Sequence, residues 1–269
     1  MKTKILVCCH KKDFMATQYP YMPIHVGKAL HSDLELGIPG DNTGDNISEK
    51  NGSYCELTGM YWAWKNLKDV DIVGLCHYRR YFDLSSAKSK NREPYIRHEY
   101  RSAVDSKVID KLFVDYDIVI PGYSYIYESL MDEYAMAHSL SDIKVVEQTI
   151  KALTPEYTDA FNHVMKERNY YCGCNMLICK KQLFDDYCKW LFTILFEVEK
   201  KTDIANYDNY QKRIYGFISE RLLNVYIYKH KLSVCHRPII SLMEGTTPSR
   251  IKQLMHKFKA YLCFSLKKS

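Results

Sequence analysis

Residues 69–83 read Asp-Val-Asp-Ile-Val-Gly-Leu-Cys-His-Tyr-Arg-Arg-Tyr-Phe-Asp, and this stretch carries the clearest indication of the fold class. The apolar run at residues 72–76 is typical of a short buried strand. It ends abruptly in four polar side chains: His77, Tyr78, Arg79 and Arg80. Because ligands of open α/β sheets bind beyond the carboxyl ends of the strands, we expect a ligand at this point.

The two adjacent arginines indicate the charge of that ligand. The planar guanidinium groups of Arg79 and Arg80 match the oxygens of a phosphate, which each group can bind through two parallel hydrogen bonds. The alternative is a basic surface cluster paired with Asp83 or Asp69, since charged runs usually lie on solvated faces. The residue types alone do not separate these two interpretations.

The composition is that of a folded enzyme-sized chain. Its 269 residues permit one large α/β domain, or one domain with a helical appendage. The net charge of +6 is too small and too evenly spread to indicate a nucleic-acid-binding protein. The 23 tyrosines fit a polar site for sugars or bases, because tyrosine offers a stacking face and a hydroxyl, but they fit core filling or compositional bias equally well.

The cysteines and the apolar runs predict a cytoplasmic protein. Most of the ten cysteines lie within apolar runs, as small buried side chains do in a reducing compartment. Cys172-Gly173-Cys174 matches no zinc-binding pattern, so no metal site is assigned. The apolar run at residues 5–9 is too short for a signal peptide, and no run approaches the ~20 residues of a spanning helix.

Further strands and helices are expected along the chain. A first strand at residues 4–9 leads into polar residues that begin with His10, as in nucleotide-binding α/β domains, although no Gly-x-Gly-x-x-Gly follows. Strands are also predicted at residues 116–122 and 170–179. Helices are predicted at residues 95–104, 106–114, 141–153, 155–165, 182–198 and 216–229. This alternation indicates an α/β fold.

A turn-rich loop at residues 37–46 and the helix after it carry polar candidates for binding sugar hydroxyls. Carboxylates such as Asp45 can accept hydrogen bonds from these hydroxyls, although a plain surface loop is the alternative. Apolar residues recur every three or four positions in the helix, so we expect it to direct Asn51 and Glu56 toward the edge that holds His77. His138 follows a tyrosine-rich and acidic segment that could form an acceptor pocket.

The C-terminal residues 246–269 predict a basic amphipathic helix. Apolar side chains recur on one side of it, and lysines lie mostly on the other. Such a helix suits the anionic inner surface of a cell membrane. The alternative is a helix docked on the body of the protein.

Several segments together resemble a known bacterial family. They are Ile-His-Val-Gly at 24–27, Asn-Thr-Gly-Asp-Asn-Ile-Ser at 42–48, Tyr-Cys-Glu-Leu-Thr at 54–58, Tyr-Trp-Ala-Trp-Lys-Asn at 61–66, Gly-Leu-Cys-His-Tyr-Arg-Arg-Tyr-Phe at 74–82, Asn-Met at 175–176 and Gly-Phe-Ile-Ser-Glu-Arg-Leu at 216–222. They are similar to a family of capsule, exopolysaccharide and O-antigen gene clusters, long labelled a domain of unknown function. Its members are taken to be GT-A-like glycosyltransferases, some linked to galactofuranose transfer. The resemblance extends over residues 3–240.

The resemblance implies a GT-A-like three-layer fold with a mixed central sheet and added helices, over residues 1–245. It implies a UDP-sugar donor and a lipid-linked glycan acceptor at the inner face of the membrane. In GT-A enzymes, Asp-x-Asp at a strand end holds manganese or magnesium on the donor diphosphate, but His-Tyr-Arg at 77–79 occupies that place here. Asp-Val-Asp at 69–71 precedes the strand and should lie at the opposite edge, so metal dependence stays open.

Sugar transfer requires charge relief on the leaving diphosphate and, in an inverting enzyme, a carboxylate base for the acceptor hydroxyl. Arg79 and Arg80 are predicted to supply the first, with His77 as a hydrogen-bond donor or a lone metal ligand. Glu220 is predicted to be the base; alternatively it is a helix-start carboxylate that stabilises the helix dipole. Asn175 resembles the asparagine that ends the strand beside the donor sugar. The remaining substrate-binding candidates are Tyr78, Asp45, Glu56, His138, Arg221 and His10.

These observations predict a glycosyltransferase that is cytoplasmic and peripheral on the membrane. A non-catalytic accessory protein that binds nucleotide or glycan is the alternative, because the Asp-x-Asp is missing. A nucleotide hydrolase or phosphotransferase fits less well, because no glycine loop that would cradle phosphate is present.

Overall fold

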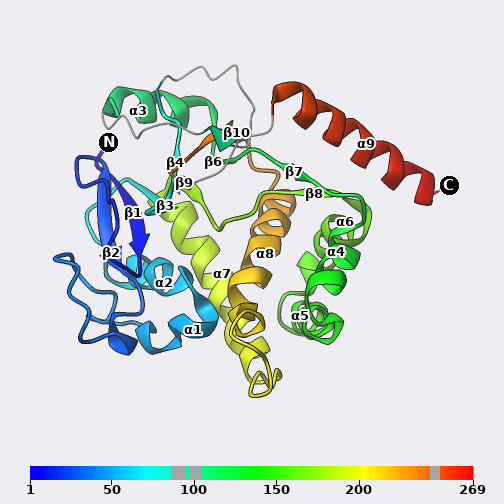
Figure 1. Ribbon diagram of the computed structural model, residues 1–269, viewed down its shortest axis with the longest axis horizontal. Coiled ribbons are helices and arrows are strands. Elements are labelled where there is room, and N and C mark those ends of the chain that lie inside the picture. The colour runs from blue at the N-terminus through cyan, green and yellow to red at the C-terminus, as the bar shows by residue number, and fades with distance from the viewer. Residues whose placement is uncertain (86–94, 97–103, 243–248, 269) are drawn as a thin grey trace. The chain divides into compact units, whose positions relative to one another are not determined.

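The computed structural model of the chain describes residues 1–85, 95–96, 104–242 and 249–268 (Figure 1). It divides into two compact units, and the chain passes between them several times. The first unit comprises Met1–Gly122, Asn175–Cys188 and Leu232–Thr247, and the second comprises Tyr123–Cys174, Lys189–Lys231 and Pro248–Ser269. The division into residues 1–245 and a C-terminal helix from 246 stays a prediction.

A nine-stranded mixed sheet forms the core of the first unit. Its strands are β1 (Thr3–Cys9), β2 (Tyr21–His25), β3 (Ile72–His77), β4 (Arg80–Phe82), β5 (Tyr95–Ile96), β6 (Ile118–Pro121), β9 (Leu177–Lys180), β10 (Val234–Arg237) and β11 (Ile239–Ser241). β1 pairs in parallel with β2 and with β3. β9 runs antiparallel to both β3 and β6, and β6 runs parallel to β10. The predicted α/β class and mixed central sheet are therefore confirmed.

These strand directions define one functional edge of the sheet. The carboxyl ends of β1, β2, β3, β6 and β10 lie at this edge, together with the amino end of β9, because β9 alone among these runs the other way. We call it the carboxyl edge. At the carboxyl end of β3 the chain turns back into β4. β4 pairs with β11, and β11 pairs with β5.

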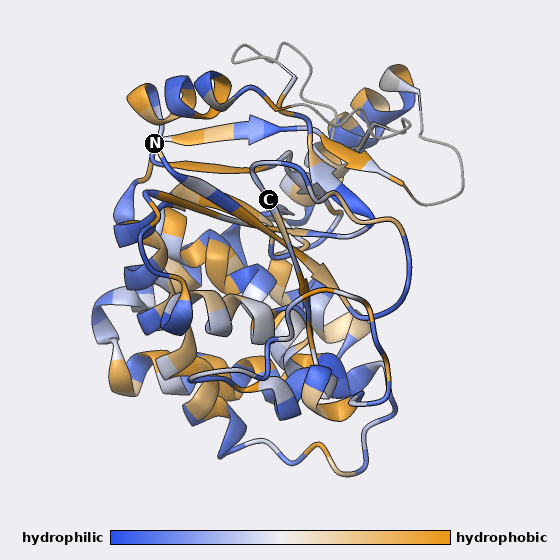
Figure 2. Cartoon of the chain, turned by 90° about the vertical axis from the view of Figure 1, so that its left-hand side faces the viewer, coloured by the Kyte–Doolittle hydropathy of each residue, from blue (hydrophilic) through white to orange (hydrophobic). Residues whose placement is uncertain are grey.

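The central strands are apolar because both of their faces are covered. Every residue of β3 from Ile72 to Cys76 is buried, as are Ile5 to Cys9 of β1. Strands of this kind read as continuous apolar runs rather than alternating patterns. Several strands carry the hydrophobic colour in Figure 2. Gly74 lies opposite Ile5 in the register and lets neighbouring side chains close over the strand.

Short helices complete the first unit: η1 (Lys28–Leu30), η2 (Ser48–Lys50), α1 (Asn51–Tyr54), α2 (Leu57–Asn66) and α3 (Ser106–Asp115). The helix predicted after residue 51 is confirmed, with a break at Cys55, whose φ is 52°. Leu57, Met60 and Tyr61 form its buried stripe, as the spacing predicts.

The second unit is mainly helical. It contains α4 (Leu130–Ala137), α5 (Leu140–Leu153), η3 (Pro155–Tyr157), α6 (Thr158–Glu167), η4 (Gln211–Arg213), α8 (Ile214–His230), α9 (Arg250–Lys268) and the two-stranded β7 (Ser124–Tyr125) and β8 (Tyr170–Tyr171). α7 (Lys181–Glu199) begins in the first unit and continues in the second. α8 is buried on nearly all sides, which makes it the central helix of its unit.

Two predicted elements differ from the structure. Residues 95–96 form β5, paired with β11, instead of beginning a helix, and residues 97–103 lie outside the described residues. The strand predicted at 170–179 is two strands, because Cys174 and Asn175 have φ values of 69° and 48° and break the extended backbone. Asn175 therefore precedes β9 and does not end a strand.

None of the helices that the structure describes combines the length and the apolar character needed to cross a membrane.

We expect Gly74→Ala to lower the free energy of unfolding by about 1–3 kcal/mol, through overpacking of the sheet core. A Cβ at this position would lie 2.9 Å from Ile178 Cγ1 and 3.2 Å from the backbone oxygen of Leu177. The control is Gly52→Ala in α1, where nothing lies within 4 Å of the added Cβ. Urea unfolding measures both; equal stability of the two variants would contradict this account of the core.

Candidate functional site

Residues 72–82 form a tight hairpin at the carboxyl edge. β3 ends at His77 and β4 begins at Arg80, and these two residues pair across the hairpin. Paired residues of antiparallel strands direct their side chains to the same face, so His77 and Arg80 share one face of the sheet. Arg79 lies in the turn between them, where its carbonyl accepts a hydrogen bond from the backbone N–H of Leu242. The two arginines therefore have different surroundings.

Arg79 is paired with an aspartate. Its Nη2 and Nε lie 2.7 and 3.0 Å from Asp13 Oδ2, and this hydrogen bonding lowers the pKa of Asp13. The two side chains are 38% and 30% exposed. An ion pair exposed to this degree contributes little to stability, because solvent screens it. Arg79 can therefore exchange Asp13 for a more highly charged anion at small cost. Asp13 follows β1 closely in the sequence, but the sequence did not indicate this pairing.

His10 and Tyr78 lie beside this ion pair. The ring of His10 meets the ring of Tyr78 edge-on at 5.3 Å, and the Arg79 guanidinium lies 5.1 Å from the same tyrosine ring. The backbone N–H of Tyr78 donates to Cys8 at the end of β1. The structure thus brings together six residues that we call the edge cluster: His10, Asp13, His77, Tyr78, Arg79 and Arg80.

The acidic pair at residues 69–71 lies at the opposite edge, as predicted. Asp71 Oδ2 accepts from the backbone N–H of Lys2, next to the amino end of β1. At the carboxyl edge, by contrast, Arg79 has no acceptor atom that could ligate a metal. Arg79, which occupies the place of an aspartate of Asp-x-Asp, therefore cannot hold a divalent cation as that aspartate does.

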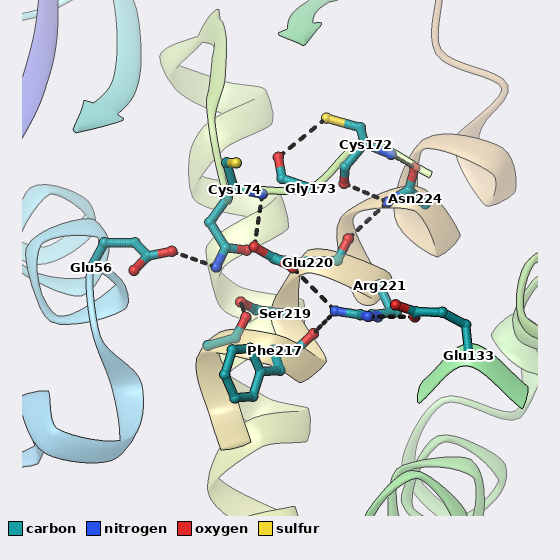
Figure 3. Close-up of polar contacts among 12 residues, drawn as sticks. Glu56, Glu133, Cys172, Gly173, Cys174, Phe217, Ser219, Glu220, Arg221 and Asn224 are labelled. Atoms are coloured by element: carbon teal, nitrogen blue, oxygen red, sulfur yellow. Dashed lines mark hydrogen bonds and ion pairs between the residues drawn. The ribbon is translucent and has the colours of Figure 1, made fainter. Parts of the chain in front are cut away.

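Glu56 and Asn175 meet at the carboxyl edge. Asn175 Nδ2 donates to Glu56 Oε1 at 2.7 Å (Figure 3). The carbonyl oxygen of Glu56 lies 3.9 Å from the thiol of Cys8, which is paired with His77 in the sheet register. Asn51 also lies near this edge, against Gly27 just beyond β2. Asn51 and Glu56 thus lie near the edge that holds His77, and substrate binding by Glu56 stays a prediction.

Asp45 is exposed and holds its loop on α2. It accepts a hydrogen bond from Tyr61 at 3.0 Å and lies 3.8 Å from Lys65. The buried carboxylate of this loop is Asp41, which accepts from the backbone N–H of Gly27 at 3.0 Å and from Ser48. A sugar-binding role for Asp45 stays a prediction.

In the second unit, Glu220 of α8 lies in a network of charges (Figure 3). Its Oε1 accepts the backbone N–H of Cys174 at 2.8 Å, and its Oε2 lies 3.1 Å from Arg221 Nη1. Arg221 Nη2 binds Glu133 Oε2 at 2.7 Å. Arg221 is 3% exposed, whereas Glu220 and Glu133 are 20% and 28% exposed. The buried guanidinium is thus held between two partly accessible carboxylates.

Glu220 does not begin its helix. α8 starts at Ile214, so Glu220 lies beyond the first turn, where the helix dipole has little effect. The alternative, a carboxylate at the helix start that stabilises the helix dipole, is therefore wrong.

Asn224 follows Glu220 by one turn and extends the same network. Its side chain accepts from the N–H of Cys172 at 2.9 Å and donates to the carbonyl of Cys172 at 3.0 Å. α8 thus fixes the segment on both sides of Gly173. The chain then passes to the first unit between Cys174 and Asn175, and each of these two residues bonds to a glutamate of its own unit.

His138 lies in an aromatic cluster of the second unit. Its ring stacks on Phe217 at 4.2 Å, and its Nδ1 lies 2.9 Å from Gln211 Oε1. Burial lowers the pKa of His138, although the hydrogen bond to Gln211 opposes this shift. These contacts favour a neutral packing residue, and substrate binding by His138 stays a prediction.

Asp13 and Asn224 were not predicted as site residues, and Glu133 was predicted only as part of the acidic segment before His138. Asn224 lies four residues after Glu220 and therefore on the same face of the predicted helix. This spacing could have identified Asn224 as a neighbour of Glu220. Arg237 ends β10 at the carboxyl edge but is 1% exposed. Asp13 and Glu133 are distant in sequence from the arginines they bind, so no local pattern identifies them.

Comparison with known proteins gives a family model and a similar solved structure. The family model described as "Domain of unknown function (DUF4422)" matches residues 4–231. The apo structure of the WbbM bifunctional glycosyltransferase is similar to this chain, with a TM-score of 0.82 and 31% sequence identity. That match covers 93% of this chain and 48% of the other, so the chain spans about half the length of that protein. No curated protein gives a significant match.

Proposed function

The chain belongs to the DUF4422 family, and on this premise we propose that it is a glycosyltransferase. The observation that carries the proposal is the similarity to the WbbM bifunctional glycosyltransferase over 93% of this chain. Because this chain spans about half of that protein, we assign it a single transfer activity. The mixed sheet with polar side chains at its carboxyl edge is consistent with a nucleotide-sugar site of the GT-A type.

The finer proposal concerns the substrates. We propose a UDP-sugar donor, with UDP-galactofuranose as one candidate, and a lipid-linked glycan acceptor of capsule, exopolysaccharide or O-antigen synthesis. The support is the resemblance of the His-Tyr-Arg-Arg-Tyr-Phe and Gly-Phe-Ile-Ser-Glu-Arg-Leu segments to families of those pathways. These assignments place the protein on the cytoplasmic side of the membrane.

The edge cluster is our candidate for the binding site of the donor diphosphate. Arg79 is accessible and bound to Asp13 by a weak ion pair, and Arg80 shares a face with His77. A leaving nucleoside diphosphate gains negative charge as the glycosidic bond breaks, and a guanidinium positioned there stabilises that charge. Arg79 would exchange the single carboxylate of Asp13 for the diphosphate, with Arg80 and His77 as further donors.

Glu220 is our candidate for the base that takes the proton of the acceptor hydroxyl. Its Oε1 accepts a hydrogen bond from the backbone N–H of Cys174, and its Oε2 accepts one from Arg221. These contacts set the orientation of the carboxylate, and a general base requires such positioning. We assign Arg221 and Glu133 a positioning role, because Arg221 is too deeply buried to bind a substrate directly.

The alternative is a binding protein without turnover, and the His-Tyr-Arg sequence in place of Asp-x-Asp favours it. The deciding experiment incubates the purified chain with a panel of UDP-sugars and glycan acceptors, with and without a chelator. We expect release of UDP together with extension of an acceptor. Activity that survives the chelator supports neutralisation by arginine, and loss of activity would assign a metal to the reaction. No release from any donor would contradict the proposal.

We expect Arg79→Gln to weaken UDP binding about 10-fold or more, because charged hydrogen bonds contribute roughly 1.5–3 kcal/mol. Asp13→Asn should strengthen UDP binding up to about 5-fold, because UDP no longer has to displace the Asp13 carboxylate from its ion pair with Arg79. The control is Lys68→Gln, which removes one positive charge from an exposed loop of the same unit. Calorimetry measures the affinities. Equal affinity of all four proteins would remove the edge cluster from the donor site.

We expect Glu220→Gln to reduce the turnover number roughly 10²–10⁴-fold while UDP affinity stays the same, because it removes the base and keeps the shape. The matched control is Glu133→Gln, which also takes one carboxylate from Arg221. It should retain turnover within about 10-fold of the original. Equal losses in both variants would show that Glu220 acts only by holding Arg221.

A further inference from the structure

The C-terminal helix α9 lies beside β7 of its unit (Figure 1). Ala260 is fully buried, and its carbonyl accepts from Asn169 Nδ2 at 3.2 Å. One turn earlier, His256 Nε2 donates to the carbonyl of Tyr125 at 2.9 Å, and Nδ1 accepts from the hydroxyl of Tyr127 at 3.0 Å. Near the end of the helix, Lys267 pairs with Glu128. Residues with small or polar side chains therefore make these contacts.

The opposite face of α9 is apolar and open. Its members, which we call the apolar stripe, are Ile251, Leu254, Met255, Phe258, Leu262 and Leu266. Exposure in this set runs from 43% at Leu262 to 74% at Leu266. At about 100° per residue, the stripe lies across the helix from Ala260 and His256. A surface helix ordinarily buries its apolar stripe in the protein, so this orientation is reversed.

The charges on α9 indicate what covers the stripe. The helix contains no aspartate or glutamate. Lys252 and Lys259 are exposed and border the stripe on one side, and Lys257 lies toward the other, where its ammonium also contacts the ring of Tyr125 at 4.5 Å. An apolar strip with lysines along its borders matches an anionic bilayer, in which acyl chains meet the strip and phosphates meet the ammonium groups.

We propose that the apolar stripe of α9 lies in the interface of an anionic lipid bilayer and holds the protein on the membrane surface. A second copy of this chain fits less well, because a symmetric pair of stripes would bring the bordering lysines of both helices together. The structure thus combines the two interpretations of this helix: α9 is docked on the protein, and its apolar side remains available. Membrane attachment would bring the proposed transferase to a lipid-linked acceptor. This role of the attachment rests on the proposed function, whereas the attachment itself is argued from α9 alone.

The test is flotation of the full chain with vesicles of phosphatidylethanolamine and phosphatidylglycerol, compared with vesicles of phosphatidylcholine alone. We expect binding to the anionic vesicles. Leu254→Ser with Phe258→Ser should weaken it about 10-fold or more, because two large apolar side chains no longer enter the interface. Lys252→Gln with Lys259→Gln should weaken it about 10-fold at low salt and less at high salt.

The matched control is Val114→Ser with Met136→Ser, which removes two apolar side chains that are 81% and 78% exposed elsewhere. It should bind as the original chain does, and thermal unfolding checks that every variant is folded. The proposal is overturned if the original chain stays with the soluble fraction, if the stripe variant binds equally well, or if the stripe variant instead converts a dimer to a monomer. Vesicle binding without sugar transfer would overturn the proposed function alone.

Discussion

The parallel pairing of β1 with β3 aligns residues 3–8 with residues 72–77, and the composition of the carboxyl edge follows from this register. Both strands are buried on both faces, and a slip of one residue would turn every side chain to the other face. In the observed register, β1 brings His10 beside Tyr78 and Asp13 beside Arg79. Apolar packing inside the sheet thus determines which charges meet at its edge.

Burial gives the arginines of this chain different roles. Arg79 is 38% exposed and paired with one aspartate, and solvent weakens that attraction. Arg221 is 3% exposed and held by two carboxylates, so loss of one would leave a buried charge poorly compensated. The first arrangement suits exchange with a ligand. The second suits the fixed orientation of Glu220 and of the segment that Asn224 holds at Cys172.

α9 shows that an amphipathic sequence does not reveal which side of a helix the protein uses. The fully buried Ala260, His256 with its two hydrogen-bond partners, and Lys267 attach it, whereas the side chains of the apolar stripe are exposed. Exposed apolar surface of this extent is costly in water and usually marks a surface that binds something. The lysines along its border are consistent with phosphates of lipid headgroups.

Local sequence determined the strands at 4–9, 72–76 and 116–122, most helices, and the position of His77 and Arg79 at a strand end, because apolar periodicity and strand length are properties of neighbouring residues. It also placed Asp69 and Asp71 at the far edge. Long-range packing, by contrast, pairs Asp13 with Arg79 and Glu133 with Arg221, and it makes β5 a strand beside β11. Those contacts join residues far apart in the chain. Their energies depend on how deeply the side chains are buried, and a local sequence pattern does not predict that burial.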